Sequence, residues 1–241
     1  TADELREKIT DKTKLLVLPY PNNPTGAIMR REDLEAIAKV LKDTNIMIAS
    51  DEIYSELTYS GKHCSIAEIE GMRERTIVIN GFSKSFAMTG WRLGFLGGPK
   101  EIVSQMLKLH QYAIMSSPTV SQYAAIVAMH SCQKDIDAMR NEYNIRRRFV
   151  VDSFNKLGLK CFAPQGAFYV FPCIKSTGMT STDFCEKLVY TKKVAVVPGD
   201  AFGECGEGYV RVSYAYSLNH LREAIKRIGE FLEDIKNGNV Q

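Results

Sequence analysis

The sequence predicts an α/β protein in which a mostly parallel sheet is followed by a smaller α+β domain. Short, continuous apolar runs in the first hundred residues are typical of parallel strands that are covered on both faces. A stretch with helical periodicity separates the first two of these runs, as in a strand, helix, strand unit. Further along, shorter strands and helices replace this pattern, which indicates a second domain.

The first part of the chain is expected to begin with an amphipathic helix over Thr1–Thr10. A second helix is expected over Arg31–Lys42, where apolar residues recur every three or four positions. The four strand-like runs are Lys14–Leu18, Ile46–Ser50, Thr76–Asn80 and Leu93–Gly97. These elements predict the sheet of the larger domain.

The later elements are mainly helices and short strands. Lys100–Leu109 is expected to be helical, and Thr119–Leu157 is expected to be mostly helical with a break near Cys132. Strands are expected at Ala167–Phe171, Val194–Val197 and Tyr209–Ser213, with helices at Thr182–Thr191 and Leu218–Lys236. We therefore expect a larger domain over residues 1–139 and a smaller C-terminal domain over 140–241.

The composition excludes several classes of protein. Lys and Arg total 31 against 28 Asp and Glu, and the basic residues are scattered, so nucleic-acid binding is not indicated. No apolar run reaches the ~20 residues that a membrane span needs. The six cysteines form no C-x-x-C pair, which is typical of free thiols in the cytoplasm. The four histidines are isolated, so no metal site is expected.

One lysine stands in an unusual setting. Lys84 follows an apolar strand in a Gly/Ser-rich turn, and Arg92 comes eight residues later. A lysine beside a second cation at a strand end can act as a nucleophile towards a carbonyl carbon. A bare Ser-Lys pair is more often a surface loop, so the longer segment decides the interpretation.

That segment, Ser-Lys-Ser-Phe-Ala-Met-Thr-Gly-Trp-Arg-Leu-Gly at 83–94, closely resembles the cofactor-lysine motif of class I/II aminotransferases, which are fold type I pyridoxal-phosphate enzymes. Two further family motifs occur in the expected order: Pro-Asn-Asn-Pro-Thr-Gly at 21–26 and Ser-Asp-Glu-Ile-Tyr at 50–54. The resemblance implies an aspartate/aromatic-type enzyme that transaminates between an amino acid and a 2-oxo acid. It also implies pyridoxal 5'-phosphate as the cofactor and residues 1–139 as part of the cofactor-binding large domain.

The resemblance also implies roles for single residues. Lys84 would carry the cofactor covalently and then move the proton at the substrate Cα. Asp51 would keep the pyridine nitrogen protonated, which lets the ring accept negative charge. Tyr54 and Asn23 would hydrogen-bond the phenolic oxygen of the cofactor. Asn23 is also placed among the substrate-binding residues.

Two arginines would hold anionic groups. Arg92 matches the family arginine that binds the cofactor phosphate through a planar, bidentate fork, and Ser83 in the same turn would share that phosphate. Arg211, in Gly-Tyr-Val-Arg-Val-Ser-Tyr at 208–214, matches the arginine that binds the α-carboxylate of the substrate. The resemblance thus implies an anion site at each end of the substrate-cofactor pair.

The resemblance begins inside the family pattern, so the chain is expected to be a C-terminal portion that lacks the N-terminal part. That part supplies a phosphate-cradling turn and a ring-stacking aromatic residue, so weak cofactor binding and poor transamination are expected of the chain by itself. The full-length enzyme is expected to be a homodimer. Three alternatives stay open: a carbon–sulfur lyase of the same fold, an aminocyclopropane-carboxylate-synthase-like activity, and a catalytically inert scaffold or binding module.

Overall fold

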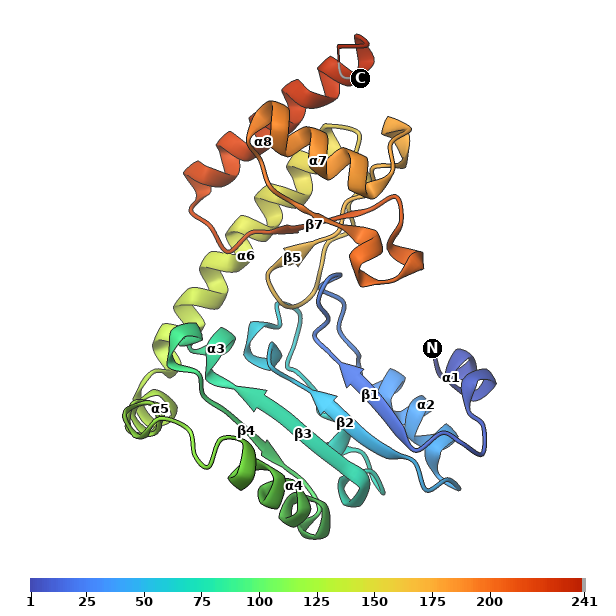
Figure 1. Ribbon diagram of the computed structural model, residues 1–241, viewed down its shortest axis with the longest axis vertical. Helices are drawn as coiled ribbons and strands as arrows, with labels where there is room; N and C mark the ends of the chain where they lie inside the picture. Colours follow the sequence, from blue (N-terminus) through green and yellow to red (C-terminus); the bar gives the residue numbers. More distant parts are fainter. Residues whose placement is uncertain (240–241) are drawn as a thin grey trace. The chain divides into compact units, whose positions relative to one another are not determined.

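A computed structural model describes residues 1–239, which divide into two compact units (Figure 1). The first unit comprises Thr1–Asn22 and Ala27–Ala138. The second comprises Asn23–Gly26 together with the chain from Met139 onward. Each unit has its own sheet, with four strands in the first and three in the second among the residues described.

The sheet of the first unit is mostly parallel, as predicted. Its strands lie in the order β1-β2-β3-β4, and β1, β2 and β3 pair in parallel. Their bounds are β1 Leu15–Pro19, β2 Met47–Asp51, β3 Thr76–Gly81 and β4 Gly94–Gly97. Each starts and ends within one residue of the predicted run.

Strand β4 departs from the expected pattern, because it pairs antiparallel with β3 and Gly81 lies opposite Gly94. A parallel return needs a crossover that is usually a full helix, and the connection here contains only the one-turn helix α3 (Phe82–Ser85) and a 3₁₀ turn at Thr89–Trp91. The expectation that the strands are covered on both faces is also wrong for this chain. All of β4 is exposed, and Leu15 and Val17 of β1 are 51% and 56% exposed.

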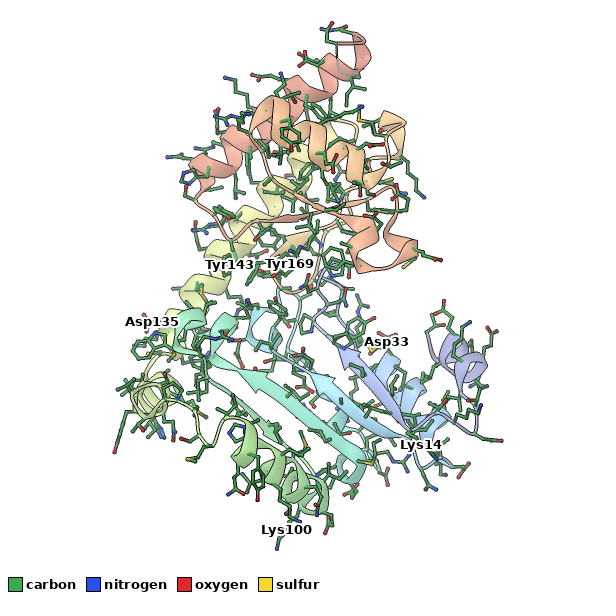
Figure 2. All side chains as sticks on the ribbon, viewed as in Figure 1. Lys14, Asp33, Lys100, Asp135, Tyr143 and Tyr169 are labelled. Atoms are coloured by element: carbon green, nitrogen blue, oxygen red, sulfur yellow. The ribbon has the colours of Figure 1, made fainter. Side chains whose placement is uncertain are left out.

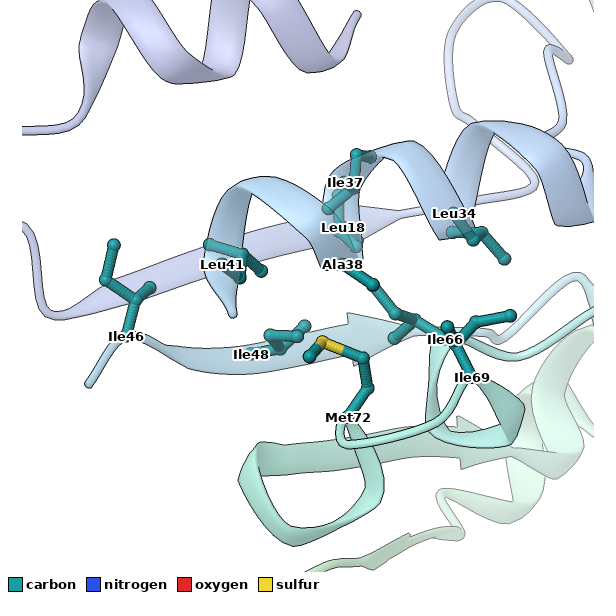
Figure 3. Close-up of a cluster of buried hydrophobic side chains, with 10 residues drawn as sticks. All are labelled: Leu18, Leu34, Ile37, Ala38, Leu41, Ile46, Ile48, Ile66, Ile69 and Met72. Atoms are coloured by element: carbon teal, nitrogen blue, oxygen red, sulfur yellow. The ribbon is translucent and has the colours of Figure 1, made fainter. Parts of the chain in front are cut away.

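Helix α2 (Arg31–Leu41) covers one face of this sheet and forms the core of the unit (Figure 3). It begins where the side chain of Asp33 accepts a hydrogen bond of 2.9 Å from the backbone N–H of Arg30. Its apolar side chains pack against β1, β2 and the segment that follows β2. The buried cluster contains Leu18, Leu34, Ile37, Ala38, Leu41, Ile46, Ile48, Ile66, Ile69 and Met72.

The other helices of the first unit are α1 (Ala2–Lys8), α3 (Phe82–Ser85), α4 (Lys100–Ala113) and α5 (Thr119–Ser131). Helix α4 runs four residues further than predicted. The predicted break near Cys132 is confirmed, because α5 ends before it and α6 (Gln133–Lys156) begins after it. Helix α6 starts in the first unit and continues into the second.

The second unit has an antiparallel sheet in the order β5-β7-β6, packed with α7 (Ser181–Lys192) and α8 (Leu218–Lys236). Its strands are β5 Tyr169–Val170, β6 Val197–Pro198 and β7 Val210–Ser213. The first two are shorter than predicted. The run at Val194–Val196 does not pair with β7 and instead lines a pocket of about 580 Å³ together with residues of β7 and α8.

Short 3₁₀ turns occupy the connections in both units, and among residues 1–239 they have the following bounds. They are η1 Ser55–Leu57, η2 Ile66–Glu68, η3 Arg73–Arg75, η4 Thr89–Trp91, η5 Lys175–Thr177, η6 Gly199–Phe202 and η7 Glu204–Gly206. Within the same residues, no helix combines the length and the apolar composition that crossing a membrane requires.

The core around α2 makes a testable prediction for stability. Leu41 is fully buried, so Leu41→Ala is expected to lower the free energy of unfolding by about 2–5 kcal/mol. The matched control is Leu15→Ala, which removes the same atoms from a half-exposed side chain and should cost about 0.5 kcal/mol. Urea unfolding of the full chain measures both, and equal losses would contradict the described packing.

Candidate active site

The predicted residues of the first unit lie at the carboxyl ends of two neighbouring parallel strands. Asp51 is the last residue of β2 and pairs with Ile79 of β3. Lys84 follows β3 directly, in the short helix α3. In parallel sheets of α/β proteins, ligands bind at this edge, because the loops that leave adjacent strands converge there.

Hydrogen bonds tie the turn after β2 to β3 and to the turn after it, so the two turns form one framework. The Ser85 hydroxyl and the Asn80 amide come from the side of β3, and the backbone of Glu52 contributes a third bond. These bonds are Ser85 Oγ to the Ile53 carbonyl at 3.4 Å, Asn80 Nδ2 to Ser55 Oγ at 3.1 Å, and Glu52 N to the Ile79 carbonyl at 2.8 Å. The positions of Asp51 and Lys84 are therefore coupled through the backbone.

A buried carboxylate stabilises the same turn. Glu52 is only 5% exposed, and its oxygens accept hydrogen bonds from the hydroxyls of Ser50 at 2.9 Å and Ser65 at 2.6 Å. Nε2 of His63 lies 2.8 Å from Oε2 of Glu52. Burial by itself would raise the pKa of the Glu52 carboxyl, but the hydrogen bonds from these partners and the attraction to His63 together lower that pKa below its ordinary value.

Asp51 and Glu52 are neighbours in sequence with different surroundings. Side chains alternate along a strand, and the backbone N–H of Glu52, just after β2, still bonds to Ile79 of β3, so the two carboxylates point to opposite faces of the sheet. Asp51 stays half-buried, and its Oδ1 accepts a hydrogen bond of 3.2 Å from the backbone N–H of Ile53. Tyr54, three residues beyond Asp51, is buried with 6% exposure. Asp51 is thus the carboxylate that remains accessible to a ligand.

The turn after β3 carries the remaining residues of the first group. Ser83 and Lys84 are half-buried, and the Ser83 carbonyl accepts a hydrogen bond of 2.8 Å from the Thr89 hydroxyl. Arg92 is exposed, and its Nη1 donates to the Thr89 carbonyl at 2.9 Å. The Arg92 backbone is left-handed with φ of 52°, a conformation that costs a non-glycine residue of order 1–3 kcal/mol.

The other predicted pair lies in the second unit. Arg211, on β7, donates from Nη1 to Oδ1 of Asn23 at 2.8 Å. A guanidinium has only donors, so this bond fixes the orientation of the Asn23 amide and makes Nδ2 its donating group. The guanidinium carbon of Arg211 also lies 4.6 Å from the ring centre of Tyr169 and 4.9 Å from that of Phe202.

A glycine allows the Asn23 turn to pack in the second unit. The backbone of Gly26 is left-handed with φ of 70°, and a Cβ atom at this position would lie 2.3 Å from Pro164 Cβ. The Gly26 carbonyl accepts hydrogen bonds of 2.9 Å from the backbone N–H groups of Gln165 and Gly166. The turn motif therefore needs glycine for both conformation and space.

The seven predicted residues form two groups, one in each unit. The first group is Asp51, Tyr54, Ser83, Lys84 and Arg92, and the second is Asn23 and Arg211. The sequence reasoning missed Glu52, His63, Tyr169 and Phe202, which contact or support these residues. A glutamate directly after a strand-end aspartate signals burial only weakly, because its partners His63 and Ser65 lie eleven and thirteen residues away.

The side chains of the first group suit a cofactor with three different polar groups. A half-buried carboxylate matches a protonated ring nitrogen, a lysine amine matches an electrophilic carbonyl, and an exposed guanidinium matches a phosphate. Pyridoxal 5'-phosphate has all three groups, so the residues present fit it. Within residues 1–239, no cluster of three or more His, Cys, Asp or Glu side chains could hold a metal ion.

Comparisons with known proteins agree with this arrangement. The family model for aminotransferase class I and II matches residues 1–228. The chain is 47% identical to an aspartate aminotransferase of Pyrococcus abyssi and 46% identical to aromatic-amino-acid aminotransferase 2 of Thermococcus litoralis. These matches cover 97% and 98% of the chain, but only 61% of each relative, so the chain spans about three-fifths of their length.

A solved structure gives the same result for the fold. The aromatic aminotransferase of Pyrococcus horikoshii OT3 superimposes with a TM-score of 0.95 and 46% sequence identity. That match covers 98% of this chain and 64% of the other. The fold is therefore the fold type I architecture of these enzymes, over the part of it that the chain contains.

The buried Glu52 carboxylate and its contacts with Ser50, Ser65 and His63 predict how the free energy of unfolding depends on pH. Because the folded-state pKa of Glu52 is lowered, its contribution is complete above the unfolded-state pKa of about 4.3 and is lost as the pH falls through the folded-state value. Glu52→Gln is expected to lower the free energy of unfolding at pH 7 by about 1–3 kcal/mol. The difference from wild type should shrink as the pH falls below about 4.

Urea unfolding of the full chain at pH 7, 5 and 3 tests this expectation. The control is Glu35→Gln, the same substitution in an exposed ion pair with Arg31, which should cost less than about 1 kcal/mol at each pH. A Glu52→Gln effect that is unchanged between pH 7 and pH 3 would show that the carboxylate charge is not what stabilises the turn.

Proposed function

The chain belongs to the aminotransferase class I and II family, and we propose on this basis that the whole protein transfers an amino group between an amino acid and a 2-oxo acid with pyridoxal 5'-phosphate as cofactor. One observation carries the proposal beyond family membership. Asp51 and Lys84 leave adjacent parallel strands at the same sheet edge, on turns that hydrogen bonds hold together. This is the placement that a cofactor-binding carboxylate and amine need.

Residues 1–139 are assigned to part of the large, cofactor-binding domain and residues 140–241 to the small domain. The division of the chain between Ala138 and Met139 supports this assignment. The whole protein is proposed to be a homodimer, which the exposed apolar side chains at Tyr112, Ile114 and Met115 favour. The proposed compartment is the cytoplasm, in keeping with six cysteines that are all free.

In this assignment, the bound cofactor supplies a protonated pyridine ring that withdraws electron density from the substrate Cα. The Asp51 carboxylate would pair with the ring nitrogen and favour its protonated form, at about 1.4 kcal/mol for each unit of pKa shift. By the family resemblance, the Tyr54 hydroxyl and the Asn23 Nδ2 group would donate to the phenolic oxygen, which would favour its anionic form. These three residues set the charge distribution of the site.

Lys84 has two roles in the proposal. Its amine would hold the cofactor, and it would also move the proton at the substrate Cα. Arg92 and Ser83, which lie in the turn that follows β3, would bind the phosphate. The residues that would bind the phosphate and the lysine that would move the proton therefore lie on the same turn.

Arg211 is assigned to the α-carboxylate that amino and 2-oxo acid substrates share. Its bond to Asn23 links the substrate-binding arginine to a cofactor-binding amide. The names of the relatives include aspartate and aromatic amino acids, so the amino acids on which these relatives act differ in their side chains. The side chain of the preferred substrate is best found by assaying the whole protein with a panel of amino donors.

The assignment of Lys84 is tested by chemical trapping. After incubation with pyridoxal 5'-phosphate and reduction with borohydride, mass spectrometry is expected to find a covalent adduct on Lys84 of the whole protein. Lys84→Ala should lack the adduct and lose turnover by about 10⁴-fold or more, because one side chain holds the cofactor and moves the proton. The control Lys100→Ala removes an exposed lysine and should keep both. An adduct elsewhere, or wild-type turnover in Lys84→Ala, would refute the assignment.

The adjacent carboxylates offer a second test. Asp51→Asn should lower turnover by about 100-fold or more, because the ring nitrogen loses its anionic partner, while the free energy of unfolding changes by about 0.5 kcal/mol or less. Glu52→Gln should show the opposite balance, with a larger loss of stability than of turnover. Steady-state kinetics measure the turnover of both variants, and urea unfolding measures their free energy of unfolding. Equal turnover losses would remove the distinction between the two residues.

A further inference from the structure

The proposed substrate arginine lies against two aromatic rings. The Arg211 guanidinium carbon is 4.6 Å from the ring centre of Tyr169 and 4.9 Å from that of Phe202, well inside the ~6 Å range of cation–π attraction. We propose that Tyr169 and Phe202 are positioning residues that hold the plane of Arg211 for binding a carboxylate. This inference rests on the proposed role of Arg211.

The hydrogen bonding of Arg211 shows why its plane matters. Nη1 already donates to Asn23 Oδ1 at 2.8 Å, which uses one position on the edge of the guanidinium. The other N–H groups lie in the same plane, and a carboxylate binds them best as a coplanar, bidentate pair. A free arginine side chain would lose rotational freedom on binding, and the two rings and Asn23 reduce that loss beforehand.

The backbone around Phe202 fixes where its ring can be. Phe202 ends the turn η6, and Gly199 at the start of this turn packs against Gly206 of η7. A Cβ atom on Gly199 would lie 2.1 Å from the Gly206 carbonyl oxygen, and one on Gly206 would lie 2.0 Å from the Gly199 oxygen. Gly199 N also donates to the Tyr209 carbonyl at 2.9 Å. The loop is thus anchored on both sides of Phe202.

Further rings support both positioning residues. On one side, Phe171 lies edge-on to Phe202 at 6.3 Å and stacks on Tyr209 at 5.2 Å. On the other side, Tyr169 lies 4.7 Å from Phe168, which lies 5.6 Å from Tyr143 of α6. Tyr143 and Tyr169, both labelled in Figure 2, are thus joined through Phe168. Aromatic side chains have few rotatable bonds, so such a row restrains the guanidinium at little entropic cost.

The size of the effect follows from the rotamer freedom that Arg211 does not have to lose when a carboxylate binds. Loss of one ring is expected to weaken carboxylate affinity by about 2- to 10-fold, the range for immobilising one long side chain. Arg211 and Phe202 are half-buried and Tyr169 is 7% exposed, so both rings restrict the guanidinium before a ligand arrives. The loss of Arg211 itself should cost more, because the charge and the bidentate geometry disappear together.

The experiment compares ring-removing and ring-retaining variants of the whole protein with its cofactor. The ring-removing variants are Tyr169→Leu and Phe202→Leu, and the ring-retaining ones are Tyr169→Phe and Phe202→Tyr. Calorimetry with succinate and with 3-phenylpropionate measures carboxylate affinity without turnover, and kinetics separate KM from kcat. Ring removal should weaken binding and raise KM about 2- to 10-fold with a smaller change in kcat, and ring retention should restore most of the affinity. The matched control is Tyr190→Leu, which removes a ring that is 75% exposed.

A double-mutant comparison separates positioning from general packing. If the rings act through Arg211, then Phe202→Leu should lower kcat/KM in wild type but have little further effect in Arg211→Leu. An equal effect in both backgrounds, or none in either, would overturn the positioning role while leaving the proposed function intact. If Arg211→Leu itself binds carboxylates and turns over like wild type, the proposed role of Arg211 fails. Thermal unfolding of each variant confirms that folded proteins are being compared.

Discussion

The parallel pairing of β2 with β3 is the constraint on which the first unit depends. It brings Asp51 opposite Ile79, so that the turn bearing Lys84 begins at the same edge where β2 ends. Hydrogen bonds from the β3 side then join the two turns. The buried Glu52 carboxylate adds a third anchor from the segment that follows. Asp51 and Lys84, which a ligand can reach at this edge, are therefore held in place by polar groups that do not face the ligand.

A comparable logic governs the second unit, where β7 is the central strand of the small sheet. One neighbour, β5, places Tyr169 beside it through the pairing with Ser213, and the other, β6, pairs Val197 with Arg211 and leads into the loop of Phe202. Arg211 thus receives one ring from each side of its strand. A central strand can surround a side chain in this way, whereas an edge strand has a neighbour on only one side.

Much of the architecture could be predicted from the sequence because it depends on local periodicity. The predicted helix at Leu218–Lys236 is confirmed at both ends, and the break at Cys132 is confirmed as well. The antiparallel direction of β4 could not be predicted, because direction depends on the path of the chain between strands. The motifs identified the candidate residues that carry charge or an amine. They did not identify His63 or Phe202, whose contacts with Glu52 and Arg211 come from tertiary packing alone.

The alternation at the end of β2 has a consequence for how the chain reaches its fold. A slip of one residue in the pairing of β2 with β3 would exchange the faces of Asp51 and Glu52, burying the shorter carboxylate and exposing the longer one. In the slipped arrangement, the shorter side chain of Asp51 would have to satisfy donors that sit where the longer Glu52 reaches. The contacts of Glu52 with Ser50, Ser65 and His63 therefore favour the register that leaves Asp51 on the accessible face of the sheet.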